Sequence, residues 1–429
     1  MKNFWSSRFY SLKVKNYRIY YISQMISLCG TWMQTIGQDW LVLKITGSAT
    51  QLGIVSAFQF LPVLLLGPFG GVIADRFDKR KVLLFTQSVA GILALILGIL
   101  VVTNSVQIWM IYVLALCLGL VNTINAPSQQ TFVPEMVGRE NLSNAVRLFS
   151  VLVNVGRAVG PAIAGIVIAS FGIGDCFIIN AISYIAVIIG LSMMDVKELQ
   201  TTSKTKSKKG GGSQLMEGFR YVKNNPVLLN TLLMMTIIGT LTFEFSVSLP
   251  VFAKFSLGGD ASTYAFLVTV MGTGSIVGGI LMAGRKKAST HMLVVSALLF
   301  GIFFTLVSLM PNIYFASILL FLTGLFSTNF IALGNTMLQL ESKPEMRGRV
   351  MSLWSMAFMG STPIGGPIIG WISEYAGPRF GIATGGIAAI IAAGVGSMVL
   401  FKKDKPLTVT PEVEIATEEA YMSSRRLKD

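Results

Sequence analysis

The sequence carries few charged residues. Asp, Glu, Lys and Arg make up 13% of its 429 residues, whereas 53% are hydrophobic. Soluble domains contain about 25% charged residues. The chain therefore lacks the polar side chains that would cover soluble domains of this total length, and the sequence predicts a membrane protein.

Residues that carry common enzymatic chemistry are also scarce. His291 is the only histidine, which excludes a Ser/His/Asp set within the apolar segments. The three cysteines show no CxxC or Cys/His spacing, which excludes a disulfide framework and a zinc site. The absence of a GxxxxGK[ST] sequence argues against an ATP-driven pump. We predict a protein that is not an enzyme and that uses no cofactor and no metal.

Long apolar runs are abundant. About 20 helical residues cross the hydrocarbon core of a bilayer, and the sequence offers twelve candidate spans. They lie near 19–45, 50–74, 82–103, 107–130, 146–170, 175–194, 229–254, 263–284, 291–310, 313–338, 350–374 and 380–401. We expect an all-α membrane protein with twelve transmembrane helices in two six-helix, pseudo-symmetric bundles.

The net charge of +14 is unevenly distributed. Nearly all of the 34 Lys and Arg residues lie in the tails or in the turns after even-numbered spans; the exceptions are Lys44, Arg157, Lys254 and Arg379. This asymmetry predicts that both termini are cytoplasmic, in the cell inner (plasma) membrane, with some attraction to lipid headgroups. No single basic patch with interleaved aromatics exists, which argues against a nucleic-acid partner.

One polar segment divides the spans into six and six. Lys197–Asn225 includes TTSKTKSKKGGGS, which is typical of a flexible linker, and then MEGFRYVKNN, which has the spacing of an interfacial helix. We expect an N-terminal half at 1–196 and a cytoplasmic linker with an interfacial helix at 197–227. A C-terminal half at 228–402 and a cytoplasmic tail at 403–429 follow.

The two halves repeat each other. PEMVGR at Pro134–Arg139 recurs as PEMRGR at Pro344–Arg349, and GPAIAG from Gly160 recurs as GPIIG from Gly366. Both halves begin on the same side of the membrane after an even number of spans. The repeats are therefore parallel, an arrangement that places a binding site near the midplane between the halves.

These features resemble the major facilitator superfamily over residues 10–402. GGVIADRFDKRK at Gly70–Lys81 is similar to the signature turn between spans two and three, with Asp78 in place of a glycine. Stretches such as INAPSQQTFVPEMV at Ile124–Val137 are similar to the branch that contains enterobactin and macrolide exporters. The residues that match the signature turn are Gly71, Asp75, Arg76, Lys79 and Arg80.

A second motif lies on span five. GRAVGPAIAG resembles the superfamily's antiporter motif, through Gly156, Gly160, Pro161, Ala164 and Gly165. Small residues four apart let a neighbouring backbone approach closely, and proline bends the helix. We expect a kinked helix at the interface between the halves; ordinary helix packing is the alternative. The export direction is implied by the resemblance alone.

Three ionisable side chains lie within predicted spans. Arg157 should face the bundle interior and have a partner, since a charge inside a span costs at least about 2.5–3.5 kcal/mol. The acids available are Glu244 on span seven and Asp39 on span one. We expect Glu244, nearer the middle of its span, to carry protons, with Asp39 second and Arg157 modulating the acid's proton affinity. Three alternatives remain open: a structural ion pair, binding of a cationic substrate by Asp39 or Glu244, and an outer-gate role for Asp39.

The resemblance also implies a cytoplasmic gate. Asp75, at the end of span two, is expected to meet the start of span eleven near Arg349–Val350 when the cytoplasmic side is closed. For the basic residues of the turn, a purely topological role is equally consistent with the sequence. Ion pairs that exchange partners would extend the gate to Glu135, Arg139, Glu345 and Arg349.

Isolated polar and aromatic side chains mark the expected substrate wall, on spans that line the cavity in the superfamily or on span eleven. A few polar groups on an apolar wall suit an amphipathic organic molecule, although each is equally consistent with helix packing. The candidates are Gln34, Gln38, Asn122, Asn125, Phe243, Asn329, Asn335 and Trp354, with Phe358 one turn from Trp354.

The sequence therefore predicts a monomeric secondary transporter of the efflux type. It is expected to export an amphipathic small molecule, such as a drug, a macrolide or a siderophore-like compound, by alternating access in exchange for protons. An importing proton symporter and a non-transporting membrane sensor on the same scaffold are the alternatives.

Overall fold

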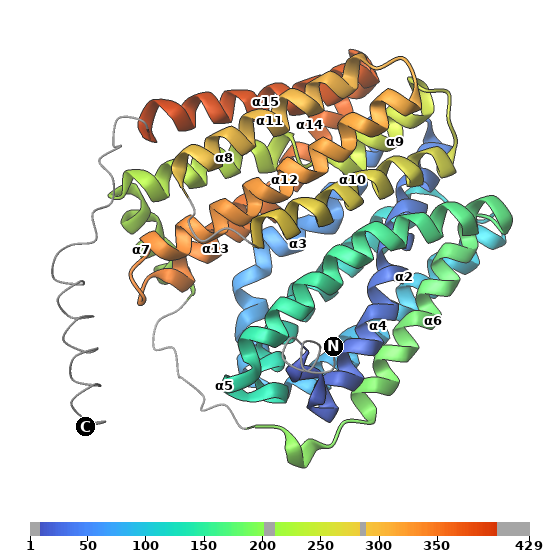
Figure 1. The fold of residues 1–429 in the computed structure, drawn as a ribbon. Coiled ribbons are helices and arrows are strands. Elements are labelled where there is room, and N and C mark those ends of the chain that lie inside the picture. The colour runs from blue at the N-terminus through green and yellow to red at the C-terminus, as the bar shows by residue number, and fades with distance from the viewer. Residues whose placement is uncertain (1–8, 201–210, 284–288, 401–429) are drawn as a thin grey trace, which may run out of the picture.

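The computed structural model describes residues 9–200, 211–283 and 289–400. Within these residues, all regular structure is helical. Figure 1 shows two groups of helices, one coloured blue to green and the other yellow to red, that lie against each other. Two sequence halves therefore form two bundles.

The first bundle contains the helices before the linker. The long helices α2 and α5 pack on each other, α3 packs on α5, and α6 packs on α2 and α4. The bounds are η1 Tyr10–Lys13, α2 Lys15–Thr46, α3 Ala49–Arg76, α4 Lys79–Val102, α5 Ile108–Ser170, α6 Ile173–Ser192 and η2 Val196–Glu198.

The second bundle contains the helices after the linker. Here α10 packs on α12, α11 packs on α12 and α15, and α8 packs on α15 and α13. The bounds are α7 Gly211–Lys223, α8 Pro226–Leu241, α9 Phe245–Phe255, α10 Ala261–Ala283, α11 Thr290–Leu309, α12 Ile313–Glu341, α13 Arg347–Met359, α14 Thr362–Tyr375 and α15 Pro378–Leu400.

Ten helical stretches of the described chain are long and apolar enough to cross a bilayer, compared with the twelve predicted. The remaining two places are filled by α2 and by the pair α13 and α14. Helix α2 contains many polar residues, including the buried Gln34, Gln38 and Asp39. Span eleven is interrupted at Gly360 and Ser361, so neither of its two helices is long enough alone.

Two further features depart from straight, separate helices. Spans four and five follow each other within α5, whose backbone turns at Gly138 with φ 73° and ψ 172°. This positive φ requires glycine, and the amide end of the flexible Gln200 side chain packs against it. Span seven is divided into α8 and α9, with Glu244 as the N-cap of α9.

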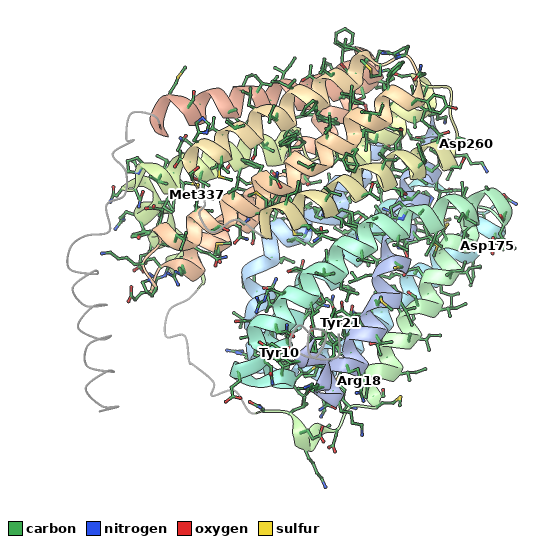
Figure 2. The ribbon with its side chains drawn as sticks, in the orientation of Figure 1. Tyr10, Arg18, Tyr21, Asp175, Asp260 and Met337 are labelled. Atoms are coloured by element: carbon green, nitrogen blue, oxygen red, sulfur yellow. The ribbon has the colours of Figure 1, made fainter. Side chains whose placement is uncertain are left out.

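The molecule has two ends, which we call the distal end and the linker end. The distal end carries the glycine turns at Gly47, Gly258 and Gly377, each with positive φ. The linker end carries η1, η2 and α7. Figure 2 shows Asp175 and Asp260 together at the distal end, and Tyr10, Arg18 and Tyr21 at the other.

One hydrophobic cluster joins the bundles at the distal end. It combines Leu43 and Leu52 of the first bundle with Val251 and Ile369 of the second, all almost completely buried. Between membrane-spanning helices such a cluster holds the bundles together through close van der Waals packing. The apolar core therefore continues across the interface at this end.

Candidate functional site

The bundles approach most closely where α3 crosses α14. A Cβ on Gly53 would lie 2.3 Å from the Gly366 carbonyl oxygen, and one on Gly370 would lie 2.5 Å from the Ala49 carbonyl oxygen. Only glycine permits backbones at this distance. We call the contact between Gly53 and Gly366 the glycine crossing.

Hydrogen bonds reinforce this contact. Glu374 Oε2 on α14 accepts hydrogen bonds from the Ser48 hydroxyl at 2.5 Å and from the Thr50 N–H at 2.8 Å. Lys254 Nζ on α9 donates to the Leu43 carbonyl oxygen at 2.7 Å. These bonds cap the first turn of α3 and the last turn of α2 from the opposite bundle.

Asp39 on α2 forms a third polar link between the bundles. The Tyr264 hydroxyl on α10 donates to Asp39 Oδ2 at 2.7 Å, and both residues are buried. The Ser246 side chain, next to the break in span seven, lies near this carboxyl group. Among the described residues, the bonds of Asp39, Glu374 and Lys254 are the hydrogen bonds that link the two bundles. All of them lie in the distal half.

Glu244 lies at the break in span seven and is 3% exposed. Its Oε1 is buried and has no hydrogen-bond partner. The carboxyl group lies against α14: a Cβ on Gly365 would be 2.9 Å from Oε1, and one on Gly366 would be 3.5 Å from Oε2. Glu244 therefore lies directly behind the glycine crossing.

The break itself is held by span twelve. The Thr242 hydroxyl donates to the Gly385 carbonyl oxygen at 2.7 Å. On the other side, the Thr240 carbonyl oxygen lies so close to Gly365 that a Cβ there would be only 1.7 Å away. The local backbone thus fixes the Glu244 side chain between α8 and α14.

Arg157 on α5 does not have the partner that the sequence suggested. Its guanidinium lies over the Trp32 ring, 5.2 Å from the centroid, and its Nε is buried without a hydrogen-bond partner. Among the described residues it forms no ion pair with Asp39 or Glu244. The expected pair is absent because Asp39 lies seven residues, about 10 Å of helix, beyond Trp32, and Glu244 faces α14.

The antiporter-like motif contacts both bundles. Cβ atoms on Gly156 and Gly160 would meet Leu28, Trp32 and Cys29 of α2. A Cβ on Gly165 would lie 3.2 Å from Ala265 Cβ on α10. Pro161 lies within the helix between these contacts. The same helix therefore packs on its own bundle through two glycines and on the opposite bundle through a third.

At the linker end, ion pairs form within each bundle. Lys79 Nζ lies 2.6 Å from Glu135 Oε1 in the first bundle, and an Arg349 terminal nitrogen lies 2.8 Å from Glu217 Oε1 in the second. Arg80 donates to the Leu191 and Ser192 carbonyl oxygens at 2.6 and 2.9 Å. These three basic side chains thus interact with their own bundle.

The remaining gate candidates contribute less. Arg76 and Glu345 are exposed, and Gly71 has no neighbouring atom that a Cβ would meet. Helix α3 does contact α13, but the Leu64 side chain lies near Gly360, at the end of α13 rather than at its start. The side chains of Asp75 and Arg139 lie outside the described residues, so the partner of Asp75 stays a prediction.

Most of the predicted amides bond to neighbours in their own bundle. Gln34 accepts from Asn180 at 2.6 Å, Gln38 donates to Gln59 at 3.2 Å, and Asn125 accepts from Thr86 and Gln87 at 3.0 and 3.1 Å. Asn335 accepts from Gln339 one turn along the same helix.

The other two amides differ. Asn329 Oδ1 is buried without a hydrogen-bond partner, and Asn122 is partly exposed. Among the polar wall candidates, these two have side chains that are not engaged by described neighbours.

The aromatic candidates form a cluster at the break in span seven. Phe243 contacts Phe245, Phe300 and Phe358 with ring centroids 5.2–5.7 Å apart. Trp354 is buried. Its ring packs on Gly334, where a Cβ would lie only 2.6 Å from the nearest ring carbon. Both therefore contribute to the packing of the second bundle.

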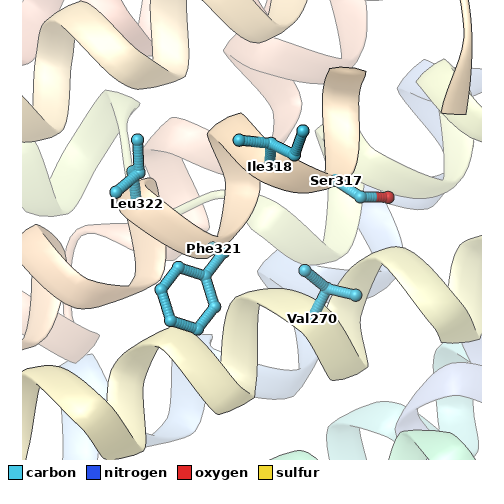
Figure 3. A pocket seen from close by; sticks show the side chains of 5 residues that line it. All are labelled: Val270, Ser317, Ile318, Phe321 and Leu322. Carbon is cyan, nitrogen blue, oxygen red and sulfur yellow. The ribbon is translucent and has the colours of Figure 1, made fainter. Parts of the chain in front are cut away.

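A shallow apolar groove of about 290 Å³ lies between α10 and α12 (Figure 3). Figure 3 shows that it is formed by two neighbouring helices of one bundle and contains none of the predicted residues. It is lined by Val270, Ser317, Ile318, Phe321 and Leu322.

Sequence reasoning did not identify three residues that the structure brings to the interface. Glu374 and Tyr264 supply inter-bundle hydrogen bonds, and Trp32 supports Arg157. The sequence does contain a signal for Glu374, because it follows the GPIIG repeat by four residues at the end of a span.

Two bundles of membrane-crossing helices, joined at one end and carrying buried acids between them, define a multi-pass membrane transporter of the major facilitator type. The chain belongs to the family described as Transmembrane secretion effector, whose model matches residues 6–421. It is a transporter of the exporter-like branch of the superfamily and not an enzyme.

Named relatives agree with this assignment. The chain is 27% identical to the Staphyloferrin A transporter of Staphylococcus aureus, over 81% of this chain and 87% of the relative. It is 22% identical to Macrolide efflux protein A of Streptococcus pyogenes, over 85% and 88%. It is also 22% identical to the Enterobactin exporter EntS of Escherichia coli, over 92% and 94%.

Solved structures show the same fold. A bacterial homologue of the human lysosomal transporter Spinster, in an inward-facing and unoccupied conformation, superposes with a TM-score of 0.73 at 14% identity, over 90% of this chain and 97% of that one. A POT family transporter in complex with 5-aminolevulinic acid gives 0.72 at 12% identity, over 91% and 96%.

Proposed function

We propose that this protein exports an amphipathic small molecule by alternating access, in exchange for protons. The named relatives are transporters of siderophores and macrolides, which supports an organic substrate with both polar and apolar parts. The basic linker end would face the cytoplasm, with both termini and the 197–227 linker, so that the distal end faces outward.

The proposal that transport is coupled to protons rests on the environment of Glu244. It is a buried carboxyl group with one unpartnered oxygen, at a break in a span, behind the glycine crossing that joins the bundles. An acid whose surroundings change when the bundles separate changes its proton affinity. Opening the distal end would move α14 away from α3 and let Glu244 exchange protons with the outside.

Asp39 has a different place in the cycle. Its carboxyl group accepts a hydrogen bond from Tyr264 of the opposite bundle, so it would release that bond when the distal end opens. This favours Asp39 as part of the outer gate. It remains the second candidate for proton carriage, because the same opening would expose it.

The cytoplasmic gate is proposed from the linker-end charges. In this arrangement Lys79 and Arg349 pair within their own bundles. Closing the linker end would bring Asp75 to the start of α13, and the pairs would exchange partners across the bundles. The protein would act as a monomer in contact with lipid, with one half at 1–196 and the other at 228–402.

Proton-driven uptake into inside-out vesicles tests the proposal. Candidate macrolides and siderophores are added under an imposed pH gradient, and wild type is compared with Glu244→Gln and Asp39→Asn. We expect Glu244→Gln to abolish accumulation while passive exchange of a neutral substrate survives, and Asp39→Asn to have a milder effect.

The vesicle experiment also separates the alternatives. Full coupling in Glu244→Gln would transfer the role to Asp39, and full coupling in the double variant would end the carboxylate mechanism. Accumulation only in the opposite orientation would identify an importer, and no accumulation of any tested compound in either orientation would favour a sensor.

A further inference from the structure

Arg157 is a cation inside a span for which the described protein supplies no counterion. It donates no hydrogen bond and forms no ion pair within the described chain, and its Nε is buried without a partner. Basic side chains at the ends of spans behave differently. Lys254, Arg379 and Arg80 each donate to backbone carbonyl oxygens at 2.6–2.7 Å.

Neither of the two acids that could neutralise Arg157 forms an ion pair with it among the described residues. Asp39 accepts the Tyr264 hydroxyl, and Glu244 lies against Gly365 and Gly366 of α14. An uncompensated charge in a span costs at least about 2.5–3.5 kcal/mol. A guanidinium that is held there without a counterion is therefore suited to receive one from outside the protein.

Arg157 lies between the two bundles. A Cβ on Gly272 of α10 would lie 3.0 Å from both the Arg157 carbonyl oxygen and Ala158 Cα, so α5 and α10 are in backbone contact at this level. On the other side, the Trp32 ring of α2 lies under the guanidinium, 5.2 Å from Cζ. Arg157 thus lies where one helix of the second bundle meets two helices of the first.

The Trp32 ring holds the guanidinium in place without neutralising it. A cation–π contact fixes the plane of the group, while the N–H groups at its edge stay available. Such a planar fork matches a carboxylate bidentately, and an indole face accepts a flat apolar body by stacking. Together, the two side chains recognise an acid attached to an apolar or aromatic frame.

We propose that Arg157 and Trp32 form an anion subsite for the exported molecule, so that the preferred substrate class is an amphipathic carboxylate or similarly acidic organic compound. The inference rests on the proposed export function and adds the substrate's charge to it. A cationic amphipathic drug would meet an unpaired positive charge and would be rejected by repulsion.

Equilibrium binding tests the subsite without any transport step. Purified full-length protein in lipid nanodiscs is titrated calorimetrically with 2-naphthoate, 2-naphthamide and 2-naphthylmethylammonium. These probes share one ring system and carry negative, zero and positive charge. We expect 2-naphthoate to bind at least tenfold more tightly than the ammonium probe.

Variants assign the effect to Arg157. Arg157→Gln should weaken 2-naphthoate binding about tenfold or more and leave the amide unchanged, and Arg157→Lys should restore part of the preference. Trp32→Leu should weaken all three probes, because stacking does not depend on charge. Lys44→Gln, which removes an exposed cation near the distal end, is the matched control and should keep the preference.

Two results would overturn the subsite. One is a wild-type protein that binds 2-naphthoate no better than 2-naphthylmethylammonium, and the other is a preference that survives Arg157→Gln. Because binding needs no proton gradient, an acid preference that depends on Arg157 would stand even if the vesicle experiment disproved proton-coupled export.

Discussion

The two ends of the molecule use polar side chains in opposite ways. At the distal end, Glu374, Lys254 and Tyr264 bond to the opposite bundle. At the linker end, Lys79, Arg80 and Arg349 bond to their own bundle. Among the described residues, hydrogen bonds between the bundles therefore occur at the distal end only. This is the arrangement expected of a transporter that is closed on one side.

The chemistry of the two ends differs as well. The distal contacts join carboxylates and an ammonium to neutral hydroxyl, amide and carbonyl groups, whereas the linker-end contacts include ion pairs between full charges. A hydrogen bond to a charged group contributes about 1.5–3 kcal/mol at most, so a few such contacts can hold the distal end closed and still let it open. Four experiments follow, from the largest expected effect to the smallest.

Gly53→Ala should have the largest effect, because its Cβ would lie 2.3 Å from the Gly366 carbonyl oxygen and force α3 from α14. We expect transport to fall more than about tenfold, since overpacking at a tight contact costs roughly 1–3 kcal/mol. Spin labels at Lys44 and Tyr375, on opposite bundles at the distal end, should report longer distances.

The matched control for this change is Gly67→Ala on the same helix, where a Cβ would meet no atom within 4 Å. It should leave both transport and the label distances unchanged. An unchanged distance in Gly53→Ala would show that the glycine crossing does not determine distal closure.

Glu374→Gln should weaken distal closure without disturbing packing. The variant keeps the shape of the side chain but removes the charge that accepts from Ser48 and Thr50. Because Glu374 is exposed, we expect a loss of about 1 kcal/mol, or roughly a fivefold rise in the distally open population. The same label pair measures this shift.

Asp175→Asn serves as the comparison for Glu374→Gln, because Asp175 lies at the distal end in the first turn of α6. It should leave the distance distribution unchanged. Equal shifts in both variants would indicate a general effect of surface charge and would exclude a specific Glu374 clamp.

Much of this fold was predictable from the sequence, because a bilayer imposes span length and apolar composition on each helix. The parallel repeats correctly indicated two bundles. Two of the twelve predicted spans, α2 and the pair α13 and α14, are not continuous apolar helices of spanning length. There, buried polar residues and the interruption at Gly360 replace the apolar run that marks a span.

The side-chain partners were less predictable, because they depend on helix rotation and on the conformation adopted. Arg157 and Asp39 occur in neighbouring spans, yet Trp32 faces the arginine and Asp39 lies two turns farther along α2. Glu374 resembles any solvent-facing acid at the end of a span. Only the crossing of α14 over the first turn of α3 makes it a partner of Thr50.

Lys79→Gln should leave the distal end unaffected, in contrast to Glu374→Gln. The Lys79–Glu135 pair joins two helices of one bundle, so its loss should cost less than about 1 kcal/mol of stability. The distance between the labels at Lys44 and Tyr375 should stay as in wild type. A longer distance would mean that the pair controls the opposite end and that the two ends are not separable.

Asp260→Asn should produce the smallest change, confined to the start of α10, the helix that carries Tyr264. Asp260 Oδ1 accepts hydrogen bonds from the Ser262 hydroxyl at 2.6 Å and from the Thr263 N–H at 2.9 Å. These bonds, that of Ser262 first, hold the pKa of the Asp260 carboxyl below its ordinary value. A carboxyl with a lowered pKa in the folded state stabilises the fold above its unfolded pKa, and this stabilisation is lost as the pH falls through the folded pKa.

The melting temperature of wild type should therefore decrease more than that of Asp260→Asn between neutral pH and about pH 3, since the variant cannot ionise. Asp260→Ser, which retains a capping oxygen, should match Asp260→Asn in this pH response, and Asp260→Ala should lose about 1 kcal/mol at neutral pH. Identical pH responses in wild type and Asp260→Asn would show that this carboxylate does not stabilise the distal end of α10.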